Sequence, residues 1–218
     1  IGDRSRQIVD LPAPQGDIQA ENLVYSAPNA ARASEPLLKR LNFRIPAGSI
    51  VALVGPSGAG KSTLARLLVG AIEPSMGTVR IDGADLKQWD RQKLGRHLGY
   101  LAQDADMLPG TIAENISRFS TGVSDEEIVR AAKMANVHEL ILAMPSGYNT
   151  LLGPSGFTLS GGQRPRIGLA RAFFGSPRIL VLDEPNANLD AEGDAALDMA
   201  LAEAKKAGKD VKAATATA

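Results

Sequence analysis

The sequence contains no cysteine, which excludes disulfide bonds, thiolate metal sites and cysteine nucleophiles from its 218 residues. Aromatic residues are scarce as well, with one Trp, three Tyr and five Phe, too few for obvious base-stacking surfaces. Neither sign of charge dominates, because 24 Lys and Arg residues balance 24 Asp and Glu residues. The composition therefore argues against binding of nucleic acid through a basic face.

Long hydrophobic runs are missing too. No apolar run approaches the ~18 residues of a membrane-spanning helix, and no charged-then-apolar leader opens the sequence, so we expect neither feature in it. Hydrophobic residues at 44% and charged residues at 22% are typical of a folded domain. Residues 1–16 differ, because they are polar and end in a Pro and Gly cluster. This pattern predicts a linker, or alternatively a disordered terminus.

The order of apolar and polar segments predicts an α/β fold with a parallel sheet. Two continuous apolar runs, 50–55 and 178–184, are typical of strands that are buried on both faces. Helical spacing follows the first run at 62–72 and precedes the second at 160–174. A further helix is predicted over 191–207, with Lys residues in its last turn.

A phosphate-binding loop stands between the first of these strands and its helix. The pattern G-x-x-x-x-G-K-[ST] is matched by Gly55, Pro56, Ser57, Gly58, Ala59, Gly60, Lys61 and Ser62. Glycines let consecutive N–H groups turn toward an anion, and the helix start adds partial positive charge. We expect Lys61 to reach the β- and γ-phosphates, Ser62 to bind Mg²⁺, and Thr63 to contact the α-phosphate.

Two carboxylates follow the second buried strand. Asp183 and Glu184 come at the carboxyl end of RILVL, the edge where a parallel sheet binds its ligands. We expect Asp183 to hold Mg²⁺ through water and Glu184 to act as general base on the attacking water. Alternatively, the strand ends at a solvated acidic turn.

A third glycine cluster, Leu159-Ser160-Gly161-Gly162-Gln163, opens the helix over 160–174. A hydroxyl and two glycines at a helix start form a second anion site. One nucleotide needs only one such site within its own subunit. The economical arrangement is two chains head to tail, with Ser160, Gly162 and Gln163 of each chain closing on the phosphate loop of the other.

With these motifs the chain resembles the nucleotide-binding domain of an ATP-binding-cassette (ABC) transporter over about residues 17–215. The resemblance implies a P-loop NTPase core with a mostly parallel sheet, an antiparallel β subdomain and an inserted helical subdomain at about 104–165. It makes 17–218 a C-terminally truncated domain, and 1–16 a linker from a missing transmembrane domain. It also implies ATPase activity with ATP and Mg²⁺.

Further family motifs match in order. Gln103 stands at the Q-loop glutamine, which senses Mg²⁺ and the γ-phosphate and contacts the membrane domain. Asn188-Leu189-Asp190 matches the D-loop, and residues 153–156 stand where exporters carry an X-loop.

A narrower likeness is to the ATPases of bacterial type I secretion, which export unfolded polypeptides. It is carried by GPSGAGKSTLARLLVG, VRIDGADLKQWDRQKLGRHLGYLAQD, GTIAENISRF and LDEPNANLD. This likeness implies a homodimer across ATP at the cytoplasmic face of the bacterial inner membrane. The implied partners are the chain's own or a separate transmembrane domain, a membrane fusion protein, an outer-membrane channel and an exported polypeptide. For Trp89 we expect packing on the helical subdomain.

Three departures from the family pattern stand out. Tyr25 lies just ahead of the usual adenine-stacking position, and it either stacks on adenine or belongs to the core. Pro165 replaces a usual glutamine, and we expect it to distort the helix that carries Ser160 unless the helix start adjusts. Ala216 follows Thr215 where the family has a histidine on the γ-phosphate, which implies reduced hydrolysis or an altered C-terminal segment.

Three alternative functions stay open at this point. The first is a nucleotide-dependent dimerisation switch with little hydrolysis. The second is a soluble ABC ATPase of DNA repair or translation. The third is the ATPase of another ABC transporter, such as an importer or lipid exporter. Neutral charge and the X-loop stretch count against the second alternative. Only the stretches that resemble type I secretion oppose the third.

Overall fold

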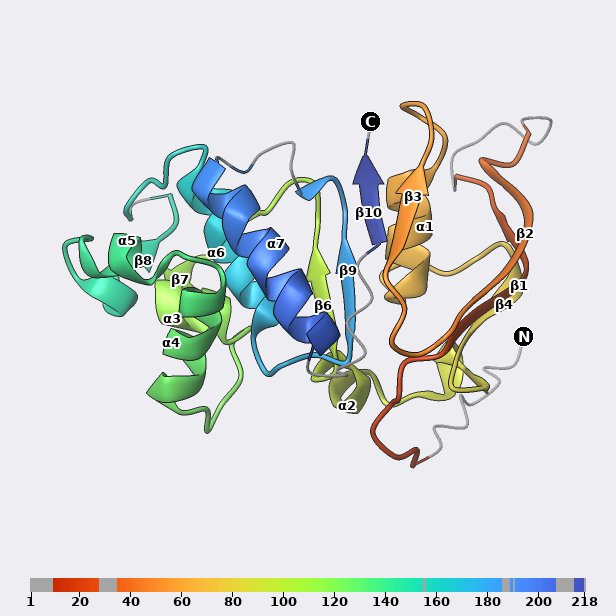
Figure 1. The fold of residues 1–218 in the computed structure, drawn as a ribbon, viewed down its shortest axis with the longest axis horizontal. Helices are drawn as coiled ribbons and strands as arrows, with labels where there is room; N and C mark the ends of the chain where they lie inside the picture. The colour runs from red at the N-terminus through yellow and green to blue at the C-terminus, as the bar shows by residue number, and fades with distance from the viewer. Residues whose placement is uncertain are drawn as a thin grey trace.

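The computed structural model describes residues 10–27, 35–154, 156–185, 189, 191–206 and 214–217. Figure 1 shows strands gathered at one side of the molecule, most of the helices at the other, and a parallel sheet between them. Within these ranges no helix is both long and apolar enough to cross a membrane. This arrangement of mixed sheets and helices is the α/β architecture that the sequence predicts.

An antiparallel sheet has the strand order β2-β1-β4-β5. Its strands are β1 (Ile18–Tyr25), β2 (Leu38–Ile45), β4 (Met76–Ile81) and β5 (Ala84–Asp85). Ile18 on β1 lies opposite Ile45 on one neighbour and Ile81 on the other, and all three side chains are buried. Alternate residues of a strand face the same side, so this register builds one apolar face.

A parallel sheet has the order β3-β10-β9-β6. Its strands are β3 (Val51–Val54), β6 (Leu98–Leu101), β9 (Ile179–Leu182) and β10 (Ala214–Thr217). Each of the four residues of β9 is 1% exposed or less, because the strand has a neighbour on both edges and cover on both faces. The predicted second buried strand is confirmed.

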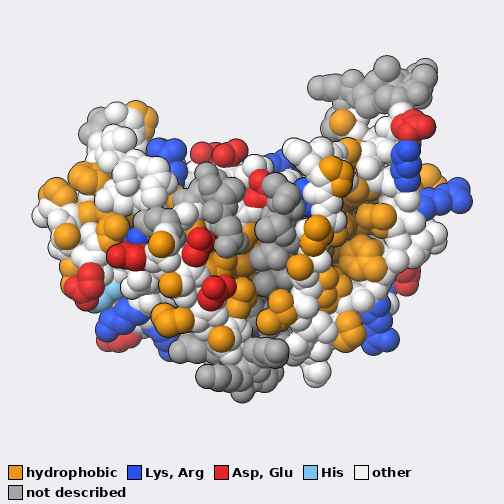
Figure 2. Space-filling view, turned by 45° about the horizontal axis from the view of Figure 1, so that its top comes forward, with side chains coloured by type: hydrophobic (Ala, Val, Ile, Leu, Met, Phe, Trp, Pro, Cys, Tyr) orange, Lys and Arg blue, Asp and Glu red, His pale blue; other side chains and the backbone are white. Residues whose placement is uncertain are grey.

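The first apolar run differs from its prediction. β3 pairs with β10 alone, and its residues alternate between half-buried and exposed. Val54 is 76% exposed. The expectation of burial on both faces is wrong for this strand in the part of the chain that the structure describes, since β3 is an edge strand there. Figure 2 shows apolar side chains gathered over this half of the molecule.

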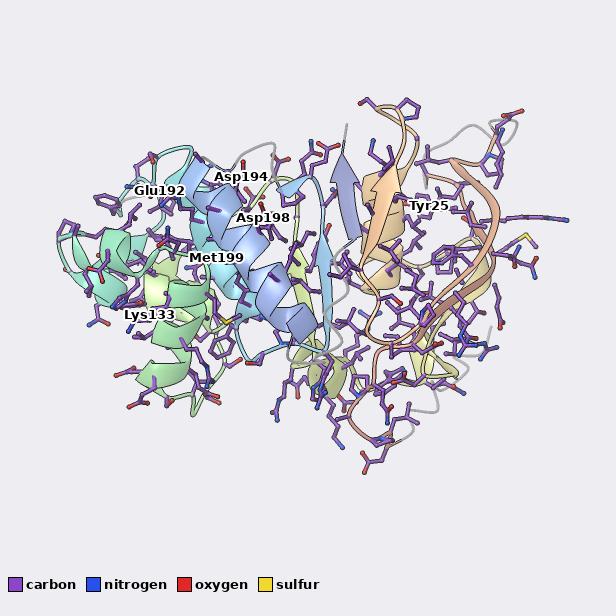
Figure 3. All side chains as sticks on the ribbon, in the orientation of Figure 1. Tyr25, Lys133, Glu192, Asp194, Asp198 and Met199 are labelled. Carbon is purple, nitrogen blue, oxygen red and sulfur yellow. The ribbon has the colours of Figure 1, made fainter. Side chains whose placement is uncertain are left out.

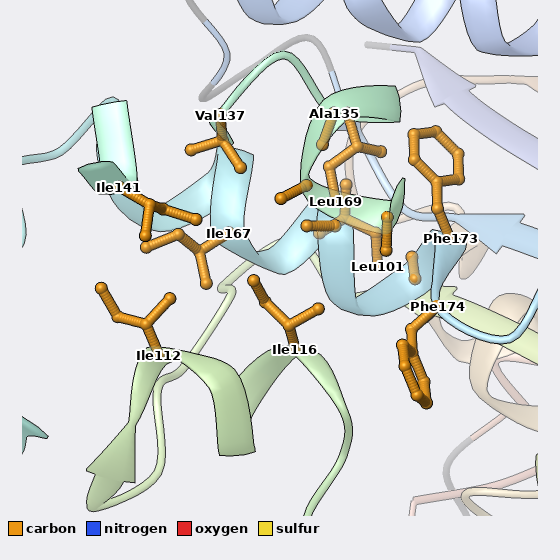
Figure 4. Close-up of a cluster of buried hydrophobic side chains, with 14 of the residues drawn as sticks. Leu101, Ile112, Ile116, Ala135, Val137, Ile141, Ile167, Leu169, Phe173 and Phe174 are labelled. Atoms are coloured by element: carbon orange, nitrogen blue, oxygen red, sulfur yellow. The ribbon is translucent and has the colours of Figure 1, made fainter. Parts of the chain in front are cut away.

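The segment between β6 and β9 is mainly helical. It contains β7 (Gly110–Thr111), α3 (Ile112–Ile116), α4 (Asp125–Met134), α5 (His138–Leu142), η2 (Gly147–Asn149), β8 (Leu151–Leu152) and α6 (Gln163–Phe173). Figure 4 shows Ile112 and Ile116 of α3 pointing toward Ile167 and Leu169 of α6. All four side chains are fully buried, so this apolar contact fixes α3 against α6.

A second apolar cluster fills the space between the two larger sheets. It includes Leu67 and Leu68 of α1 (Lys61–Leu68), Leu94 of α2 (Arg91–Gly95), and Trp89, which follows η1 (Leu86–Gln88) and is 6% exposed. The prediction that Trp89 packs on the helical subdomain is therefore wrong. The loop after β5 carries the indole to the opposite side of the parallel sheet from α3 and α4.

Residues 10–16 are attached to the antiparallel sheet. The carboxylate of Asp82, between β4 and β5, accepts hydrogen bonds from the backbone N–H groups of Gln15, Gly16 and Asp17. Pro14 is buried. In its described part, the predicted linker is thus fixed by a charged acceptor.

The C-terminal strand β10 lies in parallel between β3 and β9, with Thr215 opposite Ala52 and Leu182. The strand thus contains Thr215 and Ala216 and continues to Thr217, and the side chains of β10 lie outside the described residues. The helix α7 (Ala191–Lys206) precedes it and agrees with the predicted span.

The backbone of α6 packs directly against Gly99 of β6, and a substitution at Gly99 tests how close this contact is. A methyl group on Gly99 would lie 2.2 Å from the carbonyl oxygen of Ala172 in α6. We predict that Gly99→Ala lowers the free energy of unfolding by about 1–3 kcal/mol because the backbone must move apart. Urea unfolding followed by circular dichroism measures this loss. The control is Gly95→Ala, where a methyl group meets nothing within 4 Å. Equal stability of the two variants would contradict the prediction.

Candidate functional site

The phosphate loop connects β3 to α1 and has the backbone that its glycines require. Gly58 and Gly60 have φ of 78° and 89°, in the region that favours glycine. A methyl group on Gly60 would lie 2.7 Å from Leu38 Cδ2, so a side chain does not fit there. The loop therefore turns tightly into α1, and its N–H groups stand at a helix start where an anion is favoured.

Lys61 is buried under this loop. Its Nζ donates hydrogen bonds to the carbonyl oxygens of Gly55, at 2.7 Å, and Pro56, at 3.1 Å. The ammonium group thus lies at the centre of the turn, within reach of any anion that the loop holds.

Ser62 and Asp183 meet across the edge of the parallel sheet. The Ser62 hydroxyl donates to Asp183 Oδ1 at 2.9 Å, although 121 residues separate the two in sequence. The other carboxylate oxygen, Oδ2, is buried and has no hydrogen-bond partner among the described residues. A buried carboxylate oxygen without a donor is costly, and a hard cation is one group that satisfies it.

Glu184 and Gln103 form the second contact at this edge. The Gln103 amide donates to Glu184 Oε2 at 2.8 Å. Glu184 has φ of 48°, a conformation uncommon for a residue with a side chain. The sharp turn directly after β9 presents the Glu184 carboxylate to Gln103, which follows β6.

Tyr100 of β6 is a member of this region that motif reading missed. Burial raises the pKa of its phenol, nearby Arg66 opposes the shift, and the charge of Asp183 adds to it. The phenol oxygen is buried and has no hydrogen-bond partner among the described residues. The phenol is therefore neutral at physiological pH. Only its register opposite Val181 on β9, close to Asp183, could have indicated that Tyr100 lies in this region.

The third predicted cluster lies at the start of α6. Ser160 Oγ accepts from the Gln163 N–H at 3.3 Å, and Gln163 Oε1 accepts from the Ser160 N–H at 3.0 Å. This reciprocal pair closes the turn that leads into the helix, whose N-cap residue is Gly162. Figure 1 shows α6 among the helices, with the parallel sheet between it and α1.

Pro165 disturbs this helix less than the sequence suggests. The helix α6 begins at Gln163, so Pro165 falls in the first turn, where an N–H has no acceptor within the helix. The N–H of Arg164 still bonds to the Ser160 carbonyl oxygen at 3.2 Å. The helix start has adjusted, and the helix continues to Phe173.

Tyr25 ends β1 opposite Leu38, and it is half-buried against the second apolar cluster. Figure 3 shows it on the side of the molecule that holds α1. Leu38 also contacts the position of Gly60, so Tyr25 lies one strand away from the phosphate loop. Both predicted roles, stacking and core packing, are compatible with this place.

Parts of the remaining motifs lie outside the described residues. These are Asn188 and Asp190 of the predicted D-loop and Ser155 of the predicted X-loop. Of the D-loop motif, Leu189 is described, and it packs against the first apolar cluster.

Comparison with known proteins identifies similar chains. Residues 38–187 match the family model of the ABC transporter. The chain is 48% identical over 200 residues to the type I secretion system ATP-binding protein PrsD of Rhizobium meliloti, covering 92% of this chain and 34% of that protein. It is 42% identical over 198 residues to the human mitochondrial potassium channel ATP-binding subunit, covering 90% and 26%.

A solved structure is similar over nearly the whole chain. It is that of a bacterial Atm1-family ABC exporter with ATP bound, at a TM-score of 0.80 and 33% identity, covering 98% of this chain and 38% of the exporter. The chain thus spans about a third of the length of PrsD and of this exporter.

Lys61 provides a direct test of the phosphate loop. We predict that Lys61→Ala weakens ATP binding about 100-fold, because a charge-assisted contact to the phosphates is lost. Isothermal titration calorimetry measures the affinity. The matched control is Lys133→Ala, which removes an exposed lysine of α4 that lies away from the loop in Figure 3. Unchanged affinity for Lys61→Ala would rule out the loop as the nucleotide site.

Proposed function

Because the chain belongs to the ABC transporter family, whose ATP-binding domains are ATPases, we propose that it powers a type I secretion exporter by hydrolysing ATP between two copies of itself. The observation that carries this proposal is the convergence of Ser62, Asp183, Gln103 and Glu184 at one edge of the parallel sheet. In domain terms, we propose 17–218 as the nucleotide-binding domain, 104–165 as its helical subdomain, and 1–16 as the linker.

Binding begins at the phosphate loop in this proposal. The N–H groups of residues 57–60 surround the phosphates, and Lys61 exchanges its two carbonyl contacts for β- and γ-phosphate oxygens. Thr63, in the first turn of α1, contacts the α-phosphate. Tyr25 stacks on adenine from the neighbouring strand.

The oxygen donors fit Mg²⁺. Ser62 Oγ and Asp183 lie within hydrogen-bond distance of each other, and the unpartnered Oδ2 of Asp183 supplies a further acceptor. Ser62 and Gln103 would bind the ion directly, and Asp183 through water. When bound, Mg²⁺ neutralises charge on the phosphate oxygens.

Glu184 is the proposed general base. Its carboxylate accepts a proton from the attacking water, which lies in line with the γ-phosphate. The hydrogen bond from Gln103 holds the carboxylate at this edge. Since the same amide approaches the γ-phosphate in our proposal, it links nucleotide binding to the orientation of the base.

The second copy of the chain completes the site. The N–H groups and hydroxyl of Ser160, Gly162 and Gln163 stand at the start of α6, across the parallel sheet from the phosphate loop of the same chain. They serve the nucleotide of the partner chain in our proposal. Association is then linked to ATP binding, because each interface is closed by ligand.

The membrane partner follows from the relatives, which are about three times longer than this chain. We propose that a transmembrane domain holds the chain at the cytoplasmic face of the bacterial inner membrane. A cleft of 410 Å³ between α1, β4 and α2 offers this domain a docking surface, lined by aliphatic residues and Trp89 with charged residues such as Glu73 and Arg91 beside them. A membrane fusion protein, an outer-membrane channel and an exported polypeptide complete the assembly, as the likeness to type I secretion implies.

A second candidate function is a dimerisation switch with little hydrolysis. Ala216 favours it, because alanine offers the γ-phosphate no hydrogen bond. Glu184 remains available as a base, so we propose slow rather than absent hydrolysis.

Replacing Glu184 separates binding from chemistry. We predict that Glu184→Gln binds ATP with unchanged affinity but hydrolyses it about 100-fold or more slowly, because an amide cannot accept the proton. Single-turnover hydrolysis gives the rate, and sedimentation shows whether an ATP-bound dimer accumulates. Asp198→Asn, on the exposed face of α7, is the control. A Glu184→Gln variant as fast as the parent would exclude Glu184 as the base.

A deletion tests the transport proposal. We predict that removing the gene in its source organism eliminates at least one polypeptide from the culture medium. The wild-type allele restores secretion, and the Glu184→Gln allele does not, because transport needs hydrolysis. Mass spectrometry of the medium measures the outcome. An unchanged set of secreted polypeptides, with a new sensitivity to small toxic compounds, would instead favour a small-molecule exporter.

A further inference from the structure

Two half-buried arginines bind backbone oxygens at the junction of α3, α6 and β6. Arg118 follows α3 and has φ of 57°. Its guanidinium donates to five backbone carbonyls, those of Gly95 (2.8 Å), Leu98 (2.6 Å), Arg171 (3.0 Å), Ala172 (3.2 Å) and Phe174 (3.2 Å). Three of these belong to the C-terminal end of α6, where carbonyls lack helical partners and carry partial negative charge.

Arg171 lies in the last turn of α6. Whereas Arg118 donates from the end of α3 to α6, Arg171 donates from α6 to α3 and to the segment before it. It donates to the carbonyls of Asn115 (3.1 Å) and Asp106 (2.9 Å), to Asn115 Oδ1 (2.9 Å) and to Met107 Sδ (3.2 Å). Asn115 in turn bonds to both the N–H and the carbonyl of Leu108. We call Arg118, Arg171 and Asn115 the arginine clasp.

The clasp holds the chain on both sides of Gln103. Arg118 binds Leu98, which starts β6, and β6 ends two residues before Gln103. Arg171 binds Asp106 and Met107, which begin three residues after Gln103. The glutamine therefore lies in a short segment whose two ends are both attached to α6.

Close backbone packing keeps α6 against the same segment. A methyl group on Gly168 of α6 would lie 2.7 Å from Ala105 Cβ and 3.0 Å from Leu101 Cδ1. Ala105 lies two residues after Gln103, and Leu101 two residues before it. Gly168 thus provides an independent contact between α6 and the Gln103 segment.

The geometry of the clasp requires arginine. A guanidinium offers five N–H donors in a planar fork, whereas a lysine offers one compact ammonium group. Burial lowers the pKa of Arg118 to about 10, and the charge of Arg171 adds to this shift. Arg118 remains charged at neutral pH, so its positive charge is stabilised by the partial negative charge of the α6 carbonyls.

We infer that Arg118 and Arg171 are positioning residues that set the place of Gln103 relative to Glu184. The clasp makes α6 and the Gln103 segment one unit. A displacement of the start of α6, where Ser160 lies, then also displaces Gln103 and changes the geometry of the Gln103–Glu184 hydrogen bond. This inference rests on the proposed ATPase role of Glu184 and Gln103, and it adds residues that touch neither nucleotide nor base.

A double-mutant cycle with Gln103 tests the inference. Arg171→Lys keeps the charge and loses the fork. We expect single-turnover ATP hydrolysis to fall about tenfold with ATP affinity within about twofold of the parent, because the loss is confined to the chemical step. In a Gln103→Ala background the same substitution should change the rate by less than about twofold, because the two residues act through one contact. The control is Arg178→Lys, an exposed arginine that follows α6.

If Arg171 contributed only to the stability of the fold, the cycle would give a different result. The substitution would lower the rate by the same factor in both backgrounds, and that additive outcome would overturn the inference, as would an unchanged rate for Arg171→Lys. If Arg171→Lys does not fold, Gly168→Ala enters the same cycle, since it separates α6 from Ala105 and leaves both arginines in place.

Amide hydrogen exchange tests the clasp without relying on hydrolysis. Arg171→Lys should speed exchange over residues 104–108 by about tenfold and leave residues 56–62 unchanged, because only the first segment loses its partners. Unchanged protection over 104–108 would overturn the inference. A parent chain that hydrolyses no ATP would refute the proposed function, and the exchange measurement would still decide whether the clasp holds this segment.

Discussion

The parallel pairing of β9 with β6 and β10 is the constraint on which the remaining structure depends. Strands that run in one direction end at one edge, so residues far apart in sequence meet there. Ser62 contacts Asp183 across this edge, and Gln103 contacts Glu184. The complete burial of β9 makes this edge rigid, because no residue of the strand can move without disturbing two neighbours and two packed faces.

Much of this edge could be predicted from sequence because its signals are local. The phosphate loop has fixed spacing, and a carboxylate pair after an apolar run marks the end of a strand. The edge position of β3 could not be predicted, since burial of an apolar run depends on which elements cover it. The location of Trp89 was mispredicted for the same reason: the direction of the loop after β5 decides which cluster receives the indole.

The arginine clasp shows a second limit of sequence reasoning. Arg118 bonds to carbonyls between residues 95 and 174, and every residue offers the same backbone carbonyl whatever its side chain. No residue type in the sequence therefore marks the partners. The helix start at Gln163 was equally hidden, because the cost of Pro165 depends on a shift of three residues in the helix start, from 160 to 163, that only the folded backbone reveals.

The attachment of residues 15–17 to Asp82 has a mechanical consequence. Three N–H groups share one carboxylate, and Lys93 binds Asp10 further along the same segment. A pulling force applied to the chain ahead of Asp10 is therefore borne first by α2 and by the β4–β5 turn. The strand β1, which follows at Ile18, is shielded from peeling until those anchors break. The first attachment point of the described chain thus lies outside the parallel sheet.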